Sequence, residues 1–223
     1  MPEQILILDF GSQFTQLIAR RVRELNVYCE IHPFNHIPTI HSGIKGVILS
    51  GSPCSVRDAG APDVDIKQFG NIPVLGVCYG AQLIAHKMGG TVSPSQMREY
   101  GRAKLSTVDH HNELLKEISI DSQVWMSHAD TIVSVPENFE ITASTPSVKI
   151  AAYKLKNEKI YGIQFHPEVT RLTMHRWVVK AAHRFSLPYA QPAPDHLAGN
   201  LIHDASVKQW LSQFLERWLT LAP

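Results

Sequence analysis

Short apolar runs alternate with stretches of helical periodicity along the N-terminal half of the chain. Gln4–Phe10 is the first run, and it leads through a Gly-Ser-Gln turn into Phe14–Leu25, whose apolar residues recur at the spacing of one helical face. Three more runs follow, at Val27–Ile31, Gly46–Ser50 and Pro73–Val77. A second helical stretch, Ala81–Lys87, comes next. Continuously apolar strands are typical of burial on both faces, so the pattern predicts a doubly wound α/β fold with a mostly parallel sheet and flanking helices.

The pattern changes after Gly89-Gly90, where shorter β-like pieces are separated by polar, turn-rich segments. These pieces are Ala103–Val108, Val124–Met126, Ile141–Ser144, Ile150–Lys154 and Ile160–Phe165. We expect them to form mixed-sheet strands and hairpins.

The C-terminal segment combines an irregular connection with a helix. Residues 186–203 contain three prolines and a glycine, which argues against a core element there. Asp204 can cap a following amphipathic helix, whose apolar residues are Val207, Trp210, Leu211, Phe214, Leu215, Trp218 and Leu219. We predict one domain over residues 1–185, with residues 186–223 packed on it; packing on its own domain is favoured over a partner interface for this helix.

Composition indicates an ordinary globular chain. The 223 residues are 44% hydrophobic and 18% charged, and the net charge of +1 favours neither nucleic acid nor an anionic membrane as a partner. The first residues resemble no signal peptide, and no apolar stretch has the length of a membrane span, so a cytoplasmic location is expected. Three cysteines without a CxxC pair argue against a disulfide framework or a zinc site.

Cys78 lies in a Gly-Val-Cys-Tyr-Gly sequence between an apolar strand and a helix, which is typical of a nucleophile elbow. A turn this sharp needs residues without bulky side chains, here Gly76 and Gly80. The helix N-terminus favours a thiolate, and the amide after the cysteine can point at an oxyanion. The alternative for this motif alone is a buried structural cysteine.

A histidine and a carboxylate follow a later apolar strand, at His166-Pro167-Glu168. A thiol that attacks an amide needs a base that later protonates the leaving ammonia, and an acid that orients this base. His166 and Glu168 can fill these roles. Taken alone, His166 can also be interpreted as a hydrogen-bonded polar residue at a strand end without a catalytic role. The presence of the Cys78 motif in the same chain makes that alternative weaker.

At these two motifs the sequence resembles the class I glutamine amidotransferases, with their G-x-C-x-G-x-Q elbow and Q-x-H-P-E segment. Residues 5–16, 49–53, 98–101 and 125–130 resemble the amidotransferase domain of GMP synthase in particular. The resemblance implies a flavodoxin-like fold and the triad Cys78, His166 and Glu168. It further implies oxyanion-hole amides at Gly51, Ser52 and Tyr79, and glutamine binding by Gln82 and a loop containing Ser127, His128 and Asp130.

The resemblance implies hydrolysis of the side-chain amide of L-glutamine to glutamate and ammonia, with no metal or organic cofactor. The chain lacks the S-G-G-x-D-S loop with which GMP synthases activate a nucleotide, so a separate ATP-dependent synthetase subunit is the expected consumer of the ammonia. Ser52 and Ala129 replace family glycines, which predicts altered loop geometry and slow basal hydrolysis. Two alternatives stay open: a free-standing γ-glutamyl hydrolase and a non-catalytic regulatory module.

Overall fold

The structure of the chain is a computed structural model that describes residues 3–169, apart from the side chains of residues 96–99. The predicted C-terminal helix and the predicted boundary at residues 185–186 lie outside the described residues. The division of the chain at that boundary therefore stays a prediction.

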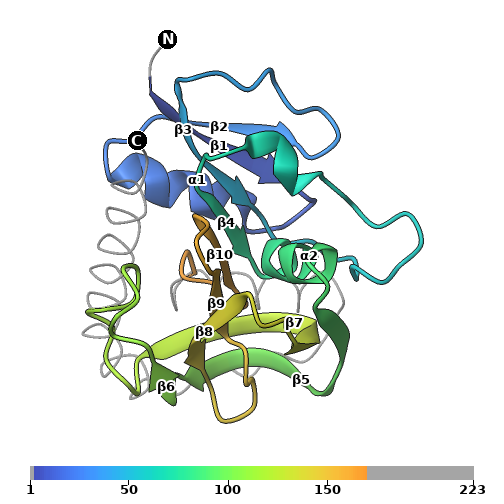
Figure 1. Ribbon diagram of the computed structural model, residues 1–223, viewed down its shortest axis with the longest axis vertical. Helices are drawn as coiled ribbons and strands as arrows, with labels where there is room; N and C mark the ends of the chain where they lie inside the picture. The colour runs from blue at the N-terminus through green and yellow to red at the C-terminus, as the bar shows by residue number, and fades with distance from the viewer. Residues whose placement is uncertain (1–2, 170–223) are drawn as a thin grey trace, which may run out of the picture.

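Eight strands form one mixed sheet with the order β2-β1-β3-β4-β10-β9-β8-β6 (Figure 1). Its members are β1 Gln4–Asp9, β2 Cys29–Pro33, β3 Ile44–Leu49, β4 Val74–Val77, β6 Thr107–Val108, β8 Phe139–Ser144, β9 Ala152–Leu155 and β10 Ile160–Ile163. Pairing is parallel from β2 to β10 and antiparallel from β10 to β6. The predicted mostly parallel α/β architecture is confirmed.

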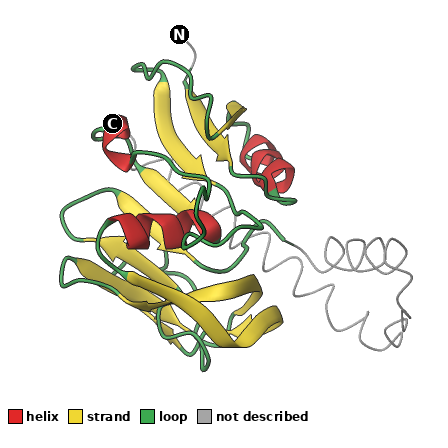
Figure 2. Ribbon diagram, turned by 90° about the vertical axis from the view of Figure 1, so that its right-hand side faces the viewer, coloured by secondary structure: helices red, strands yellow, loops and turns green. Residues whose placement is uncertain are grey.

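The parallel strands are buried on both faces, as their continuous hydrophobicity predicted. In β1, Ile5 and Ile7 belong to the core beneath helix α1, Thr15–Glu24, whereas Leu6 and Leu8 belong to the core beneath helix α2, Tyr79–Lys87. The two helices therefore cover opposite faces of the sheet, as in a doubly wound fold (Figure 2). A short 3₁₀ helix, Ile66–Phe69, adds Ile66 and Phe69 to the α2 side.

One of the short pieces predicted after Gly90, Val124–Met126, and the start of another, Ala103–Val108, belong to a single long ribbon. Strands β5, Thr91–Lys104, and β7, Gln123–Ser134, pair antiparallel and run together along the lower end of the molecule (Figure 1). The predicted loop at Ser127–Asp130 is wrong, because these residues lie within β7. The inward positions of β7 include the polar residues His128 and Asp130 between apolar ones, and this interruption made the strand look shorter than it is.

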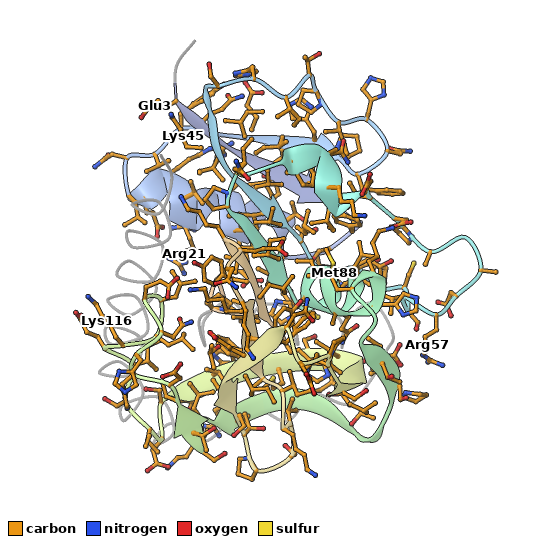
Figure 3. The ribbon with its side chains drawn as sticks, viewed as in Figure 1. Glu3, Arg21, Lys45, Arg57, Met88 and Lys116 are labelled. Atoms are coloured by element: carbon orange, nitrogen blue, oxygen red, sulfur yellow. The ribbon has the colours of Figure 1, made fainter. Side chains whose placement is uncertain are left out.

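Arg21 is a buried cation of α1. It forms an ion pair of 2.7 Å with Glu24, and its Nε donates to the main-chain oxygen of Glu168. Figure 3 shows Arg21 within the body of the molecule, whereas Lys116 and Arg57 lie at its rim. Arg21 thus joins α1 to the segment that follows β10. Within residues 3–169, no helix is long and apolar enough to cross a membrane.

Candidate active site

The carboxyl ends of β1, β3, β4 and β10 meet at one edge of the sheet, where open α/β folds bind their ligands. The turn after β1 is built by Asp9, whose Oδ1 accepts hydrogen bonds from the amides of Gly11 and Ser12 and from the hydroxyl of Thr15. The turn after β3 is held by Ser50, whose amide donates to the Leu8 oxygen. Two polar turns are thus fixed beside the end of β4.

Cys78 lies at the end of β4 with φ 54° and ψ −106°, a backbone conformation that a residue with a Cβ rarely adopts. Its amide donates to the Ile163 oxygen at 2.8 Å, which fastens the turn to β10. The flanking glycines are sterically required. A Cβ on Gly76 would lie 2.6 Å from the Gly80 backbone, and one on Gly80 would lie 2.4 Å from the Leu49 oxygen. The expected elbow at Cys78 is present in the backbone geometry.

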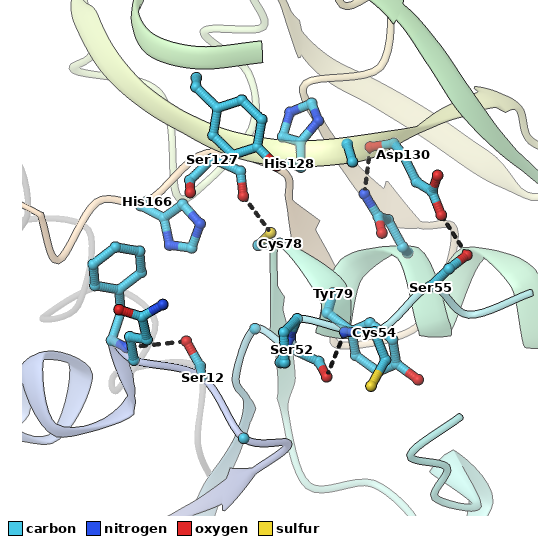
Figure 4. A pocket seen from close by; sticks show the side chains of 18 of the residues that line it. Ser12, Ser52, Cys54, Ser55, Cys78, Tyr79, Ser127, His128, Asp130 and His166 are labelled. Atoms are coloured by element: carbon cyan, nitrogen blue, oxygen red, sulfur yellow. Dashed lines mark hydrogen bonds between the residues drawn. The ribbon is translucent and has the colours of Figure 1, made fainter. Parts of the chain in front are cut away.

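His166 follows β10, and its Nδ1 lies 2.7 Å from Oε1 of Glu168. Both side chains are buried, and the ring of Phe14 packs edge-on against the imidazole, with the two ring centroids 5.0 Å apart. Nε2 of His166 has no hydrogen-bond partner within the described structure and is buried. His166 and Cys78 both line the cavity, and Figure 4 shows them as neighbours in this view. One nitrogen is therefore held by the carboxylate while the other is left for the sulfur.

Burial lowers the pKa of both histidines of the site, but their neighbouring charges shift the two pKa values in opposite directions. Burial alone would lower the pKa of His166, but the charges of Glu168 and Cys78 and the hydrogen bond to Glu168 raise that pKa to about 10. For His128, burial and then the charge of His166 lower the pKa to about 4. The geometry therefore favours a charged His166 beside a neutral His128.

The site opens into a cavity of about 470 Å³ (Figure 4). The proposed site residues that line it are Gly51, Ser52, Cys78, Tyr79, Gln82, Ser127, His128, Asp130 and His166. Glu168 lies behind His166 and is not among the lining residues. The described cavity is within the size range of small-molecule sites in proteins.

Gly51, one of the residues predicted to form the oxyanion hole, lies close to Cys78. A Cβ built on Gly51 would lie 3.7 Å from Cβ of Cys78. The amide of Gly80 donates to the Ser50 oxygen at 3.1 Å, so the loop after β3 is tied to the first turn of α2. Tyr79 is the first residue of α2, where backbone N–H groups have no partner within the helix. The amide of Tyr79 thus lies at the open end of α2, directly after Cys78, and Ser52 lines the same cavity.

Gln82 and Gln164 connect α2 with β7 behind the cavity. The Gln82 side-chain nitrogen donates to the Asp130 oxygen at 2.8 Å and to Oε1 of Gln164 at 3.2 Å. Gln164, which is fully buried, also accepts from the Ile132 amide and donates to the Ile150 oxygen. Sequence reasoning assigned no role to Gln164, although it is the first residue of the quoted Q-x-H-P-E segment.

Sequence reasoning also missed several residues that line the cavity. They are Gly11, Ser12, Gln13, Phe14, Pro53, Cys54, Ser55, Asp58 and Tyr100. The sequence could have indicated the residues at positions 11–14, because they follow a predicted parallel strand, and the turns after such strands lie at the ligand-binding edge of the sheet.

Ser52 and Ala129, which stand where the resembled family has glycine, do not have a left-handed backbone conformation. Neither Ser52 nor Ala129 has a positive φ. The hydroxyl of Ser52 accepts a hydrogen bond from the Cys54 amide at 3.2 Å, so this side chain supports the turn that it occupies. The backbone at these two positions accepts a Cβ.

Comparison with other proteins agrees with this geometry. The model of the class I glutamine amidotransferase family matches residues 6–182. The glutamine-hydrolysing GMP synthase of Cytophaga hutchinsonii is 68% identical over 171 residues, which cover 76% of this chain and 34% of that protein. The GMP synthase of Phocaeicola vulgatus is 61% identical over 170 residues, covering 76% of this chain and 33% of that protein. The chain thus spans about a third of the length of these relatives.

Solved structures share the fold at lower sequence identity. A glutamine amidotransferase from Thermotoga maritima has a TM-score of 0.76 at 20% identity, covering 98% of this chain and 99% of that one. A glutamine amidotransferase from Methylobacillus flagellatus has a TM-score of 0.73 at 20% identity, covering 100% of this chain and 95% of that one. The family match, the close relatives and the shared fold together show that this chain belongs to the class I glutamine amidotransferases.

Proposed function

We propose that the chain hydrolyses the side-chain amide of L-glutamine to glutamate and ammonia. The observation that carries the proposal is the juxtaposition of Cys78, on its strained elbow, with a buried His166 whose Nδ1 is held by Glu168. Cys78 is the nucleophile, His166 the general base and acid, and Glu168 the group that orients His166.

In the first half-reaction, the sulfur of Cys78 attacks the amide carbon, and the carbonyl oxygen takes up negative charge. The amides of Tyr79 and of Gly51 or Ser52 stabilise that oxyanion. His166, whose raised pKa favours a protonated ring, gives its proton to the leaving nitrogen. The carbon–nitrogen bond breaks, ammonia departs, and a γ-glutamyl thioester forms on Cys78.

In the second half-reaction, the now neutral His166 removes a proton from water, and the hydroxide attacks the thioester carbon. Collapse of the tetrahedral intermediate releases glutamate, and the sulfur leaves as a thiolate beside the protonated imidazole. Each proton that His166 gives in the first step is recovered in the second. No other group is needed to balance the reaction.

The amino-acid end of glutamine is proposed to lie toward Asp130. Figure 4 shows the carboxylate of Asp130 on the far side of the cavity from His166 and directed away from Cys78. A carboxylate there can bind the α-ammonium group, while Ser127 and neutral His128 supply polar contacts. Gln82 supports this end by holding the Asp130 backbone.

The test is ammonia release from L-glutamine together with detection of the thioester. Rapidly quenched mixtures should contain protein heavier by one γ-glutamyl group, attached at Cys78 and absent from Cys78→Ala. A γ-glutamyl dipeptide serves as the competing substrate. A higher kcat/KM for the dipeptide would favour the γ-glutamyl hydrolase alternative, and the absence of any thioester with either substrate would favour a non-catalytic module.

We further propose that the ammonia serves an ATP-dependent synthetase in a GMP-synthase-like amination of a nucleotide. The support is the high identity to relatives that carry this name and of which the chain spans about a third. Adding the synthetase domain of such a relative with ATP and the acceptor nucleotide should accelerate glutamine hydrolysis. Equal rates with and without these additions would contradict this proposal.

A further inference from the structure

A second set of contacts closes the cavity on the side opposite His166. Asp130 of β7 is 9% exposed, and both of its carboxylate oxygens are engaged. The hydroxyl of Ser55 donates a short hydrogen bond to Oδ2, and Nη2 of Arg57 donates to Oδ1 at 3.0 Å. Both donors belong to the loop of residues 51–58, which also carries two of the proposed oxyanion-hole residues, Gly51 and Ser52. Figure 4 shows the contact between Ser55 and Asp130.

The loop of residues 51–58 is held together internally. The amide of Ser55 donates to Oδ2 of Asp58 at 2.9 Å, the Asp58 amide donates to the Ser55 oxygen, and the Arg57 amide donates to the Ser55 hydroxyl. Ser55 therefore both organises its own turn and contacts Asp130. The Cys54 amide donates to the Ser52 hydroxyl at 3.2 Å, so hydrogen bonds within the loop continue from Ser55–Asp58 back to Ser52, the neighbour of Gly51.

The ends of the loop are anchored differently. At its start, Ser50 is fixed by main-chain bonds to Leu8 and Gly80 in the core. At its far end, the described contacts to β7 are those that Ser55 and Arg57 make with Asp130. Asp130 is itself tied to α2 through Gln82 and lies three residues after Ser127, whose oxygen accepts a hydrogen bond from the sulfur of Cys78.

We propose that Arg57 is a positioning residue, which with Ser55 fastens the loop of residues 51–58 to Asp130 and so holds the oxyanion-hole amides against Cys78. This inference rests on the proposed glutamine hydrolysis. The guanidinium is 40% exposed and the carboxylate side chain 11%, so the ion pair is partly shielded from water and acts as a charge-assisted hydrogen bond. Arg57 is absent from the cavity lining, so it acts through the loop and not on the substrate.

The test compares Arg57→Ala and Arg57→Lys with the wild type, with Arg20→Ala as the matched control. Arg20 also forms a surface ion pair, with Glu24 at 2.9 Å, but lies on α1 and outside the cavity lining. Arg57→Ala should lower kcat for L-glutamine about tenfold with KM changed less than about twofold, since the loss of one partly exposed charged hydrogen bond has this size and the oxyanion hole acts only in the transition state. Arg57→Lys should retain more activity, and Arg20→Ala should match the wild type.

Two further measurements separate positioning from substrate contact. Alkylation of Cys78 by iodoacetamide needs no oxyanion hole, so its rate should be the same in Arg57→Ala and wild type, measured on the Cys78 peptide to exclude the exposed Cys54. Hydrogen exchange of the amides in residues 51–58 should be about tenfold faster in Arg57→Ala and unchanged in Arg20→Ala.

The outcomes decide between the two proposals. A raised KM with unchanged kcat would show that Arg57 serves substrate binding, directly or through Asp130, and not the oxyanion hole, which overturns the proposed positioning role. Wild-type exchange rates in Arg57→Ala would overturn it irrespective of activity. If the wild type releases no ammonia, the proposed function fails, and the exchange rates alone decide whether Arg57 fastens the loop.

Discussion

Oε1 of Glu168 lies 2.7 Å from Nδ1 of His166, within a region of the core where the two side chains are only 2% and 3% exposed. A carboxylate in this position accepts the Nδ1 proton, which leaves Nε2 as the nitrogen proposed to transfer protons during catalysis. The arrangement separates the proton-transferring nitrogen from the nitrogen that holds the ring in place.

Replacement of the two partners should have unequal effects on turnover. His166→Ala should lower kcat by about 10² to 10⁴, because it removes the acid–base group itself. Glu168→Gln should lower kcat less, because the amide oxygen still accepts the Nδ1 proton but no longer stabilises the cation. Steady-state ammonia release measures both variants, and circular dichroism checks their folding. Equal losses would indicate structural damage.

Cys78→Ala should abolish hydrolysis without unfolding the chain, since it keeps a small side chain in the elbow. Cys78→Gly should be equally inactive yet more stable than Cys78→Ala by about 1 kcal/mol, because relief of a strained backbone outweighs the extra freedom of unfolded glycine. The control is an alanine-to-glycine change at Ala85, in α2, where the backbone is helical. Ala85→Gly should lower the free energy of unfolding by about 1 kcal/mol relative to the wild type. Chemical denaturation measures both pairs. Equal stability of the two Cys78 variants would argue against strain at the elbow.

The pKa of His166 links stability to alkaline pH. Because the folded state raises this pKa from 6.5 to about 10, the proton stabilises the fold fully below about pH 6.5, and this contribution is lost as the pH rises through about 10. Glu168→Gln removes the main charge behind the shift. The difference in unfolding free energy between wild type and Glu168→Gln should therefore shrink from pH 6.5 to 10. A constant difference would contradict the raised pKa.

The pKa of His128 links the stability of the fold to acidic pH, with a sign opposite to that of His166. Burial, followed by the charge of His166, lowers its pKa from 6.5 to about 4, so its contribution is present above about pH 6.5 and is lost as the pH falls toward 4. Against His128→Asn, which does not titrate in this range, the wild type should lose stability progressively between pH 6.5 and 4. Urea unfolding at several pH values tests this. Parallel curves for the two proteins would show that His128 titrates normally when folded.

The features of the structure that were predictable from sequence depend on local geometry. An apolar run that ends at Gly76-Val77-Cys78-Tyr79-Gly80 allows few conformations other than a sharp strand-to-helix turn, and the backbone around Cys78 adopts one. The parallel strands of the first half were predictable for a similar reason, because burial on both faces requires continuous apolar runs.

The features that were not predictable depend on distant pairing. Arg57 and Asp130 are 73 residues apart, and neither the charge nor the spacing of either residue indicates the other. The length of β7 was hidden because His128 and Asp130 occupy inward positions that an apolar pattern would fill with hydrophobic residues. Polar residues at core positions of a strand point to a site, and here they interrupted the signal for the strand that carries them.

The neighbouring strands β9 and β10 restrict the order in which their residues can change over evolution. A Cβ on Gly162 would lie 2.2 Å from the ring of Tyr153, and the hydroxyl of that tyrosine donates to the Ala81 oxygen in the first turn of α2. Any lineage that gains a side chain at position 162 must therefore first shrink position 153 and lose the bond to α2. Shrinking position 153 would remove a contact to the helix that follows Cys78, so a side chain at position 162 is expected among functional relatives only where position 153 is also smaller.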